Sequence, residues 1–143
     1  MKSEYRANIG PMSRVVRLWL FWFSLVLFLS LPWMGFTPVP QWDRVNWIPF
    51  AAPADKVRDV VLNSLLFVPL GFAVGRRRPL IAGVVLSAVM ALTISVPAEA
   101  TQLFSTRRFP SATDVATAAL GAMAGAVTTL SLRESSKPRT WTD

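Results

Sequence analysis

Side chains that can move protons or bind an anion are concentrated in one stretch of the sequence, EATQLFSTRRFPSATD, from Glu99 to Asp114. It contains two carboxylates, a side-chain amide and the adjacent guanidiniums of Arg107 and Arg108. Paired carboxylates can act as general acid and base or hold Mg²⁺, and guanidiniums bind phosphate or carboxylate through a fork of donors. The chain has no histidine and no cysteine, which excludes a serine-histidine-aspartate triad, a thiol nucleophile and a thiolate metal site.

This stretch joins two of four long apolar segments, which cover residues 15–36, 60–75, 80–104 and 112–132. A helix needs roughly 20 apolar residues to cross the hydrocarbon core of a bilayer. The first, third and fourth segments reach that length, and the second is short unless the arginines at 76–78 lengthen it by snorkelling. The first segment exceeds the core of a signal peptide, roughly 7–15 residues, so we expect a retained span. We therefore predict an all-α integral membrane bundle of four transmembrane helices.

Basic residues are distributed unevenly over the predicted loops, and this distribution sets the orientation. Ten lysines and arginines lie in residues 1–17, 76–78 and 133–143, against five in the two other loops. Because lysine and arginine are enriched on the cytoplasmic side, both termini are predicted to be cytoplasmic. Residues 1–14 form a cytoplasmic tail, residues 15–132 the membrane domain, and residues 133–143 a disordered cytoplasmic tail. The net charge of +7 reflects this topology, and we expect no nucleic-acid partner.

Three of the predicted spans bring polar residues to the same depth on the outer side. With a rise of about 1.5 Å per residue, Glu99 lies roughly 28 Å from the start of its span at Leu80, near the outer edge of a core about 30 Å thick. Gln102 is one helical turn further, on nearly the same face. Asp114 and Asn63 each lie about one turn inside a span that is entered from outside. We therefore predict one outward-facing polar site.

Each of these residues also has a purely structural interpretation. Ser111 and Asp114 form the pattern S-x-x-D before an apolar run, which is typical of a capping box. A carboxylate inside a span is costly, so Glu99 is expected to be paired with an arginine of the 107–108 pair within hydrogen-bonding reach. Asn63 can simply bond a neighbouring helix, and the arginines can be interfacial charges. The shared depth of these residues, more than any one of them, favours a site.

Two glycine pairs have the spacing G-x-x-x-G, Gly71 with Gly75 and Gly121 with Gly125. Small residues at this spacing let helices approach closely. We therefore expect both pairs to face the interior of the bundle.

Several motifs occur in an order that resembles the VanZ-like family of bacterial membrane proteins. They are VNWIPF at residues 45–50, NSLLFVPLGF at 63–72, EATQ at 99–102, RRFPSATD at 107–114 and GAMAG at 121–125. The resemblance covers roughly residues 45–126 and implies a multi-pass protein of the bacterial inner or plasma membrane. The family's founding member is linked to teicoplanin resistance without a known reaction, so the resemblance implies a cell-envelope context and no established chemistry. Ala118 stands where the family usually has an asparagine, which puts in doubt any mechanism that needs that amide.

The function favoured by the sequence is binding of a cell-envelope component or a glycopeptide-like ligand at the outer leaflet, in envelope homeostasis or glycopeptide resistance. The predicted ligand-binding residues are Asn63, Glu99, Gln102, Arg107, Arg108, Ser111 and Asp114. Two alternatives stay open: an enzyme that acts on a lipid-linked substrate with a carboxylate acid–base pair or a metal, and a structural partner in a larger envelope complex. We expect no cofactor and no resident metal. The expected partners are the lipid bilayer, a lipid-linked or glycopeptide-like ligand, and another membrane protein or a second copy of this chain.

Overall fold

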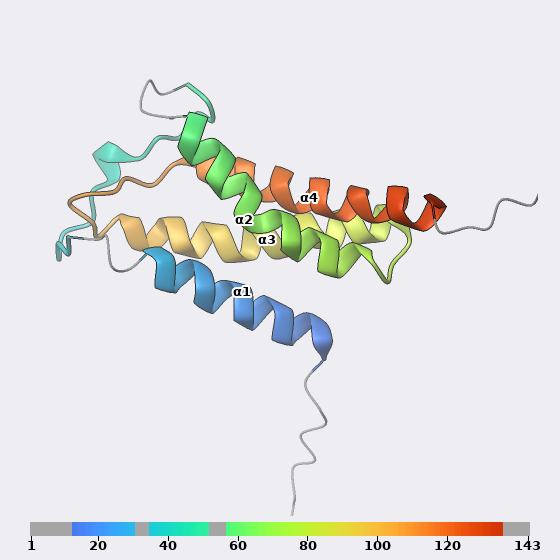
Figure 1. The fold of residues 1–143 in the computed structure, drawn as a ribbon. Helices are drawn as coiled ribbons and strands as arrows, with labels where there is room; N and C mark the ends of the chain where they lie inside the picture. Colours follow the sequence, from blue (N-terminus) through green and yellow to red (C-terminus); the bar gives the residue numbers. More distant parts are fainter. Residues whose placement is uncertain (1–12, 31–34, 52–56, 136–143) are drawn as a thin grey trace, which may run out of the picture.

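The computed structural model describes residues 13–30, 35–51 and 57–135. Within them the chain forms the helices α1 (Arg14–Ser30), α2 (Val57–Gly75), α3 (Leu80–Gln102) and α4 (Ala112–Ser135), with a 3₁₀ turn, η2 (Trp42–Arg44). The helices alternate in direction, so that segments 35–51 and 103–111 meet at one end of the bundle, called here the loop end (Figure 1). The short turn between α2 and α3 lies at the opposite end, the turn end. No strand forms in the described ranges, and the prediction of an all-helical fold is confirmed.

The helix boundaries differ from the predicted apolar segments chiefly at the end of α1 and the start of α2, and α4 continues to Ser135, beyond its predicted end at residue 132. The described part of α1 ends at Ser30, and Phe36, expected inside the first span, instead forms an isolated antiparallel bridge with Ser105. Residues 31–34 between them lie outside the described chain. α2 begins at Val57, three residues before the predicted apolar segment. Its first turn is polar and so lay outside that segment, but the acidic Asp59 suits the positive end of a helix.

Two helices of the described chain, α2 and α3, are long and apolar enough to cross a membrane. α2 has 19 residues, so the prediction that the second segment is short was wrong. α1 has 17 residues in its described part, and threonines and serines interrupt the 24 residues of α4. Large apolar side chains on the outer surfaces, such as Leu65 at 57% and Ile81 at 77% exposure, suit contact with lipid. These features are typical of helices in a membrane protein.

α2 and α4 approach each other backbone to backbone through glycines. A Cβ atom added to Gly71 would overlap the backbone carbonyl of Ala122, and one added to Gly121 would overlap the backbone carbonyl of Ser64. Such an approach is possible only where no side chain separates the two backbones. All four glycines of the two G-x-x-x-G pairs are buried, as their spacing predicts.

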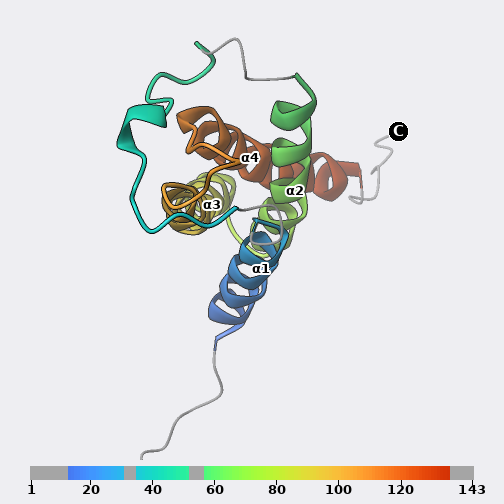
Figure 2. The same cartoon turned by 90° about the vertical axis from the view of Figure 1, so that its left-hand side faces the viewer.

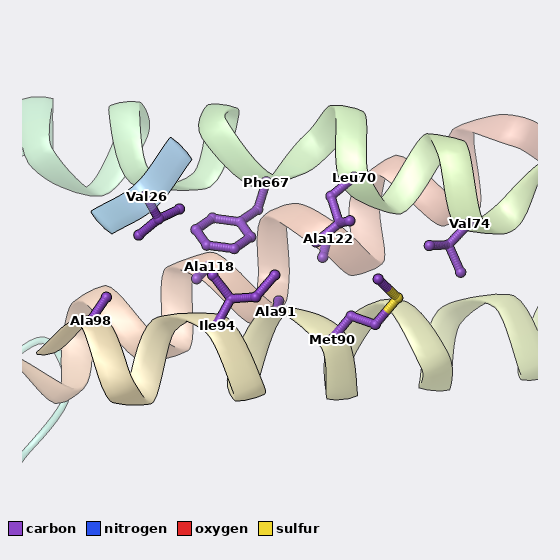
Figure 3. Packing of buried hydrophobic residues seen from close by; sticks show 10 residues of the cluster. All are labelled: Val26, Phe67, Leu70, Val74, Met90, Ala91, Ile94, Ala98, Ala118 and Ala122. Atoms are coloured by element: carbon purple, nitrogen blue, oxygen red, sulfur yellow. The ribbon is translucent and has the colours of Figure 1, made fainter. Parts of the chain in front are cut away.

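The apolar core lies between α2, α3 and α4. Phe67 and Leu70 of α2 pack with Met90 and Ile94 of α3, and alanines of α3 and α4 fill the narrower spaces (Figure 3). Ala118 is one of these alanines and is fully buried. The core is therefore tight on the glycine-lined side and filled by large side chains on the side of α3.

α1 lies at the edge of the bundle and is attached by two tryptophans. Trp19 Nε1 donates a hydrogen bond to Thr93 Oγ1 of α3 at 2.8 Å, and Trp22 Nε1 donates to the backbone oxygen of Leu66 in α2 at 3.1 Å. Toward its start at the turn end, α1 diverges from the other helices (Figures 1 and 2). Apolar side chains of α1, from Val15 to Phe23, add packing against the core to these two hydrogen bonds.

Replacing Gly121 with alanine is expected to destabilise the bundle, although alanine favours a helix over glycine by about 1 kcal/mol. The added methyl would overlap the Ser64 carbonyl, and overpacking typically costs about 1–3 kcal/mol. Thermal unfolding of the detergent-purified protein measures the change. Ala124→Leu is the matched control because Ala124 is exposed on the same helix. An equal loss of stability in both variants would contradict the packing role of Gly121.

Candidate functional site

A cavity of about 630 Å³ lies at the loop end between α1, α2 and α3, with the start of α4 and the preceding loop forming one wall. We call it the loop-end cavity. Its polar lining residues are Ser30, Arg58, Asp59, Asn63, Ser95, Glu99, Gln102, Arg107, Arg108 and Asp114. Its apolar lining residues are Val26, Leu29, Leu62, Leu66, Phe67 and Ala98. The cavity therefore offers charges of both signs, two side-chain amides and an apolar floor.

Six of the seven predicted site residues line this cavity, namely Asn63, Glu99, Gln102, Arg107, Arg108 and Asp114. They come from three helices and one loop, in keeping with the depth calculated from the helical rise. Ser111 is absent from the lining but contacts Glu99 through its backbone. Their roles in ligand binding stay a prediction.

Glu99 ties the end of α3 to the start of α4. Its Oε2 accepts a hydrogen bond from the backbone N–H of Ser111 at 2.8 Å, and its Oε1 accepts one from Gln102 Nε2 at 2.9 Å. The prediction that an arginine bonds Glu99 was wrong. In the described ranges neither Arg107 nor Arg108 donates a hydrogen bond to this carboxylate. The first N–H groups of a helix lack intrahelical partners, so the start of α4 can supply the compensation that was expected from a guanidinium.

Ser111 is the N-cap of α4. Its Oγ accepts the backbone N–H of Thr113 at 3.2 Å, as the capping interpretation predicts. In a capping box the backbone N–H of the cap residue is the donor for the side chain three residues later, here Asp114. In this chain that N–H donates to Glu99 of the neighbouring helix. The residue that caps α4 through its side chain therefore also joins α4 to α3 through its backbone N–H.

Asn63 joins α2 to the first turns of α4. Its Nδ2 donates to the backbone oxygen of Asp114 and to Thr117 Oγ1, the latter at 3.0 Å. The helix-bonding interpretation of Asn63 thus describes its amide nitrogen. Its Oδ1 makes no hydrogen bond within the described part of the chain, and this oxygen is the acceptor that Asn63 can offer to a ligand.

The loop that carries the two arginines is shaped by a buried serine. Ser105 is fully buried, and its Oγ accepts the backbone N–H groups of Arg107 at 3.2 Å and Arg108 at 3.0 Å. The N–H of Thr106 donates to the oxygen of Gly35 at 2.7 Å, which fixes the loop to the preceding outer segment. The backbone is therefore held while both arginine side chains remain exposed at the edge of the cavity.

Segment 35–51 runs around the ends of α3 and α4 and is joined to the second loop by backbone hydrogen bonds (Figure 2). The N–H of Asn46 donates to the oxygen of Pro110 at 2.9 Å, and the N–H of Ala112 donates to the oxygen of Asn46 at 2.8 Å. The guanidinium of Arg44 lies over the ring of Phe109, 3.5 Å from its centroid. The motifs VNWIPF and RRFPSATD, distant in sequence, therefore form one structural unit.

Four polar lining residues were missed by the sequence reasoning: Ser30, Ser95, Arg58 and Asp59. Ser95 is 5% exposed, and in the described chain its Oγ has no hydrogen-bond partner. It precedes Glu99 by four residues, and this spacing on one helix face is the signal that could have found it. Arg58 and Asp59 were assigned to the loop because α2 was expected to begin after them.

An apolar groove of about 560 Å³ lies on the other side of Glu99, along α3 and α4. Trp42 and Trp47 of segment 35–51 line it, together with Val96 of α3 and Val115 of α4. Glu99 lines both this groove and the loop-end cavity. The carboxylate therefore stands where a polar space meets an apolar one.

Within the described residues, no group of three or more acidic, histidine or cysteine side chains is arranged to hold a metal ion. The side chains of the cavity offer hydrogen bonds and fixed charges. Such an arrangement can orient a ligand and neutralise an anion.

The family model described as VanZ/LLP1 matches residues 15–133. This chain belongs to the VanZ/LLP1 family. The resemblance drawn from the motifs is thereby confirmed, and the VanZ/LLP1 match extends beyond residues 45–126 to include α1. No curated protein and no solved structure matches the chain.

Replacing Glu99 with alanine is expected to destabilise this VanZ/LLP1 protein by about 1–3 kcal/mol, because the Ser111 N–H and the Gln102 amide lose their acceptor. Glu99→Gln retains a carbonyl acceptor and should lose less. Thermal unfolding in detergent measures both variants. Ser95→Ala is the control on the same helix face, because its hydroxyl has no partner to lose within the described chain. A Glu99→Ala variant as stable as the native protein would show that the bond to α4 is dispensable.

Proposed function

We propose that this protein binds an anionic, lipid-linked component of the bacterial cell envelope in the loop-end cavity, at the outer leaflet of the plasma membrane. The observation that carries the proposal is that Arg107, Arg108 and Ser95 line one cavity. In the described ranges neither guanidinium has an ion-pair partner, and the buried Ser95 hydroxyl has no hydrogen-bond partner. The family membership and the two apolar helices support a membrane setting.

The polar groups favour an anionic ligand that enters from the loop end. Two adjacent guanidiniums provide forks of donors for phosphate or carboxylate. A buried hydroxyl without a partner costs about 1–3 kcal/mol, which a ligand that bonds Ser95 would recover. Because Ser95 is one turn deeper than Glu99, a ligand that reaches it passes the Glu99 carboxylate and the Gln102 amide. These groups would fix its orientation.

The apolar groove beside Glu99 favours a ligand that also carries a hydrocarbon chain. The groove is bordered by Trp42 and Trp47, which suit the membrane–water interface. A ligand with its charged head in the cavity and its chain along the groove would use both spaces. The same argument covers a glycopeptide-like ligand that carries an acyl chain, and this links the proposal to a role in envelope homeostasis or glycopeptide resistance.

The proposed orientation has four spans, both termini in the cytoplasm and the loop end outside. It is supported by the excess of basic residues at 1–17, 76–78 and 133–143 over the other loops. The alternation of the four helices is consistent with it, because it brings the start of α1, the turn between α2 and α3 and the end of α4 toward one end (Figure 1).

Single-cysteine labelling tests this orientation, and the chain has no native cysteine to remove. Thr106→Cys should react with a membrane-impermeant maleimide added to intact spheroplasts, because Thr106 is exposed at the loop end. Ser13→Cys, exposed before α1, should react only after the membrane is permeabilised. The opposite pattern would place the loop end in the cytoplasm and remove the outer-leaflet site.

Native mass spectrometry of the detergent-purified protein tests binding, with a polyprenyl phosphate as the probe and the corresponding polyprenol as the uncharged comparison. We expect the phosphate to bind and Arg108→Gln to weaken binding by roughly tenfold or more, because a hydrogen bond to a charged group contributes about 1.5–3 kcal/mol. The matched control is Arg77→Gln at the turn end. Equal binding of phosphate and alcohol, or equal loss in both arginine variants, would contradict an anion site at Arg108.

The enzyme alternative finds its support in Glu99 and Asp114, two carboxylates that line the same cavity. Both oxygens of Glu99 accept hydrogen bonds from the protein, which favours a positioning role over proton transfer. The scaffold alternative is decided by function in cells, read as teicoplanin susceptibility. If Glu99→Gln, Arg108→Gln and Asp114→Asn all keep full function and lipid binding, the cavity is structural and the bundle supports a partner protein.

A further inference from the structure

A second cavity, of about 880 Å³, lies at the turn end, where the loop-end site does not reach. Its basic lining residues are Arg14, Arg17, Arg76, Arg77 and Arg78. They come from two segments far apart in the sequence, the first turn of α1 and the turn between α2 and α3. We call it the arginine cavity. No acidic side chain is among the described residues that line it.

The arginine cavity gathers five exposed basic side chains on one concave surface. Within the described chain, the side chains of Arg14, Arg17 and Arg77 make no ion pair or hydrogen bond. Arg76 lies 5.5 Å from the centroid of the Phe72 ring, so one guanidinium is placed against an aromatic face. Helices α1 and α3 both begin at this end, and the positive ends of their dipoles add to the same field. A concave surface with one sign of charge concentrates counter-ions.

Membrane topology alone explains why basic residues occur on this side, but it does not explain a shared cavity. The cavity exists because α1 diverges from α2 and α3 toward its start (Figure 1). The indole hydrogen bonds of Trp19 and Trp22 attach α1 to α3 and α2, and Val15 and Leu18 nearer its start still pack against the core. Arg14 and Arg17 line the same cavity as the arginines at 76–78.

One part of the wall of the arginine cavity is apolar, which favours an occupant that carries hydrocarbon as well as negative charge. This part is formed by Val15 and Leu18 of α1 and by Ala73 and Val74 of α2. A free phosphate would use only the arginines, whereas a phospholipid would place its phosphates on the guanidiniums and its acyl chains along this wall. Basic pockets between membrane helices on the cytoplasmic side bind anionic lipid headgroups in this way.

We infer that the arginine cavity binds the headgroup of an anionic phospholipid, with a preference for one that carries two phosphodiester groups. Five guanidiniums in a space of about 880 Å³ provide donors for two phosphates. The bound lipid bridges the first turn of α1 to the turn between α2 and α3. This inference is independent of the ligand of the loop-end cavity, because no lining residue is shared.

Thermal unfolding of the full chain in detergent tests the inference, with diphosphatidylglycerol, phosphatidylglycerol and phosphatidylcholine vesicle lipids added in turn. We expect the largest rise in unfolding temperature with diphosphatidylglycerol, a smaller rise with phosphatidylglycerol and none with phosphatidylcholine. Inorganic pyrophosphate is the soluble anion for comparison. A rise with pyrophosphate as large as with diphosphatidylglycerol would assign the cavity to a soluble ligand and overturn the lipid assignment.

Two variants locate the binding site. Arg17→Gln/Arg77→Gln should weaken diphosphatidylglycerol binding by about 30-fold, since each basic residue near the lipid contributes roughly fivefold. The matched double variant Arg44→Gln/Arg133→Gln, which leaves all five arginines of the cavity in place, should bind this lipid as the native protein does. Equal weakening in both double variants would show a general effect of charge and overturn the site.

A third variant keeps all five arginines and so leaves the determinants of topology unchanged. Ala73→Trp fills the apolar wall and should reduce the stabilisation by diphosphatidylglycerol while the protein still inserts and folds. This variant keeps the inference testable if removal of arginines impairs insertion. Undiminished stabilisation of a folded Ala73→Trp protein would show that the lipid binds elsewhere.

Discussion

The backbone contact between α2 and α4 is the constraint on which the rest of the structure depends. Gly71 and Gly121 let the two helices approach until no side chain fits between them. Followed in steps of four residues toward the loop end, the same face of α2 leads through Phe67 to Asn63. Phe67 fills the core against α3, and Asn63 is held within hydrogen-bonding reach of Asp114. The core and the site are therefore successive turns of one face, and a change in the helix crossing would move both.

The parts that sequence reasoning predicted are those that follow from regular geometry. Long apolar runs predicted the four helices, although one run was shorter than a bilayer span needs, and the rise of about 1.5 Å per residue placed Glu99, Asn63 and Asp114 at one level. The glycine spacing predicted which faces turn inward. Each of these arguments uses only a period or a length, and such quantities are contained in the sequence itself.

The parts that it did not predict depend on irregular backbone. Glu99 was expected to bond an arginine, but the loop turns the N–H of Ser111 toward it, and no periodic pattern encodes that direction. The early start of α2 was missed because its first turn contains Arg58 and Asp59, and such polar residues are typical of a loop. Ser95 was missed because a single serine in an apolar helix usually satisfies itself by bonding the preceding turn, as Ser87 does with Gly83.

Ala118 belongs to the apolar core that lies beyond the loop-end cavity. One turn below Asp114, where the family usually has an asparagine, α4 presents a methyl group that packs with Phe67 and Ile94. Water in a protein interior needs about two to four polar partners, and the side chains of Phe67, Ile94 and Ala118 provide none. In the described chain the apolar core therefore begins within one helical turn of the polar lining of the loop-end cavity, so a change of residue 118 would alter both at once.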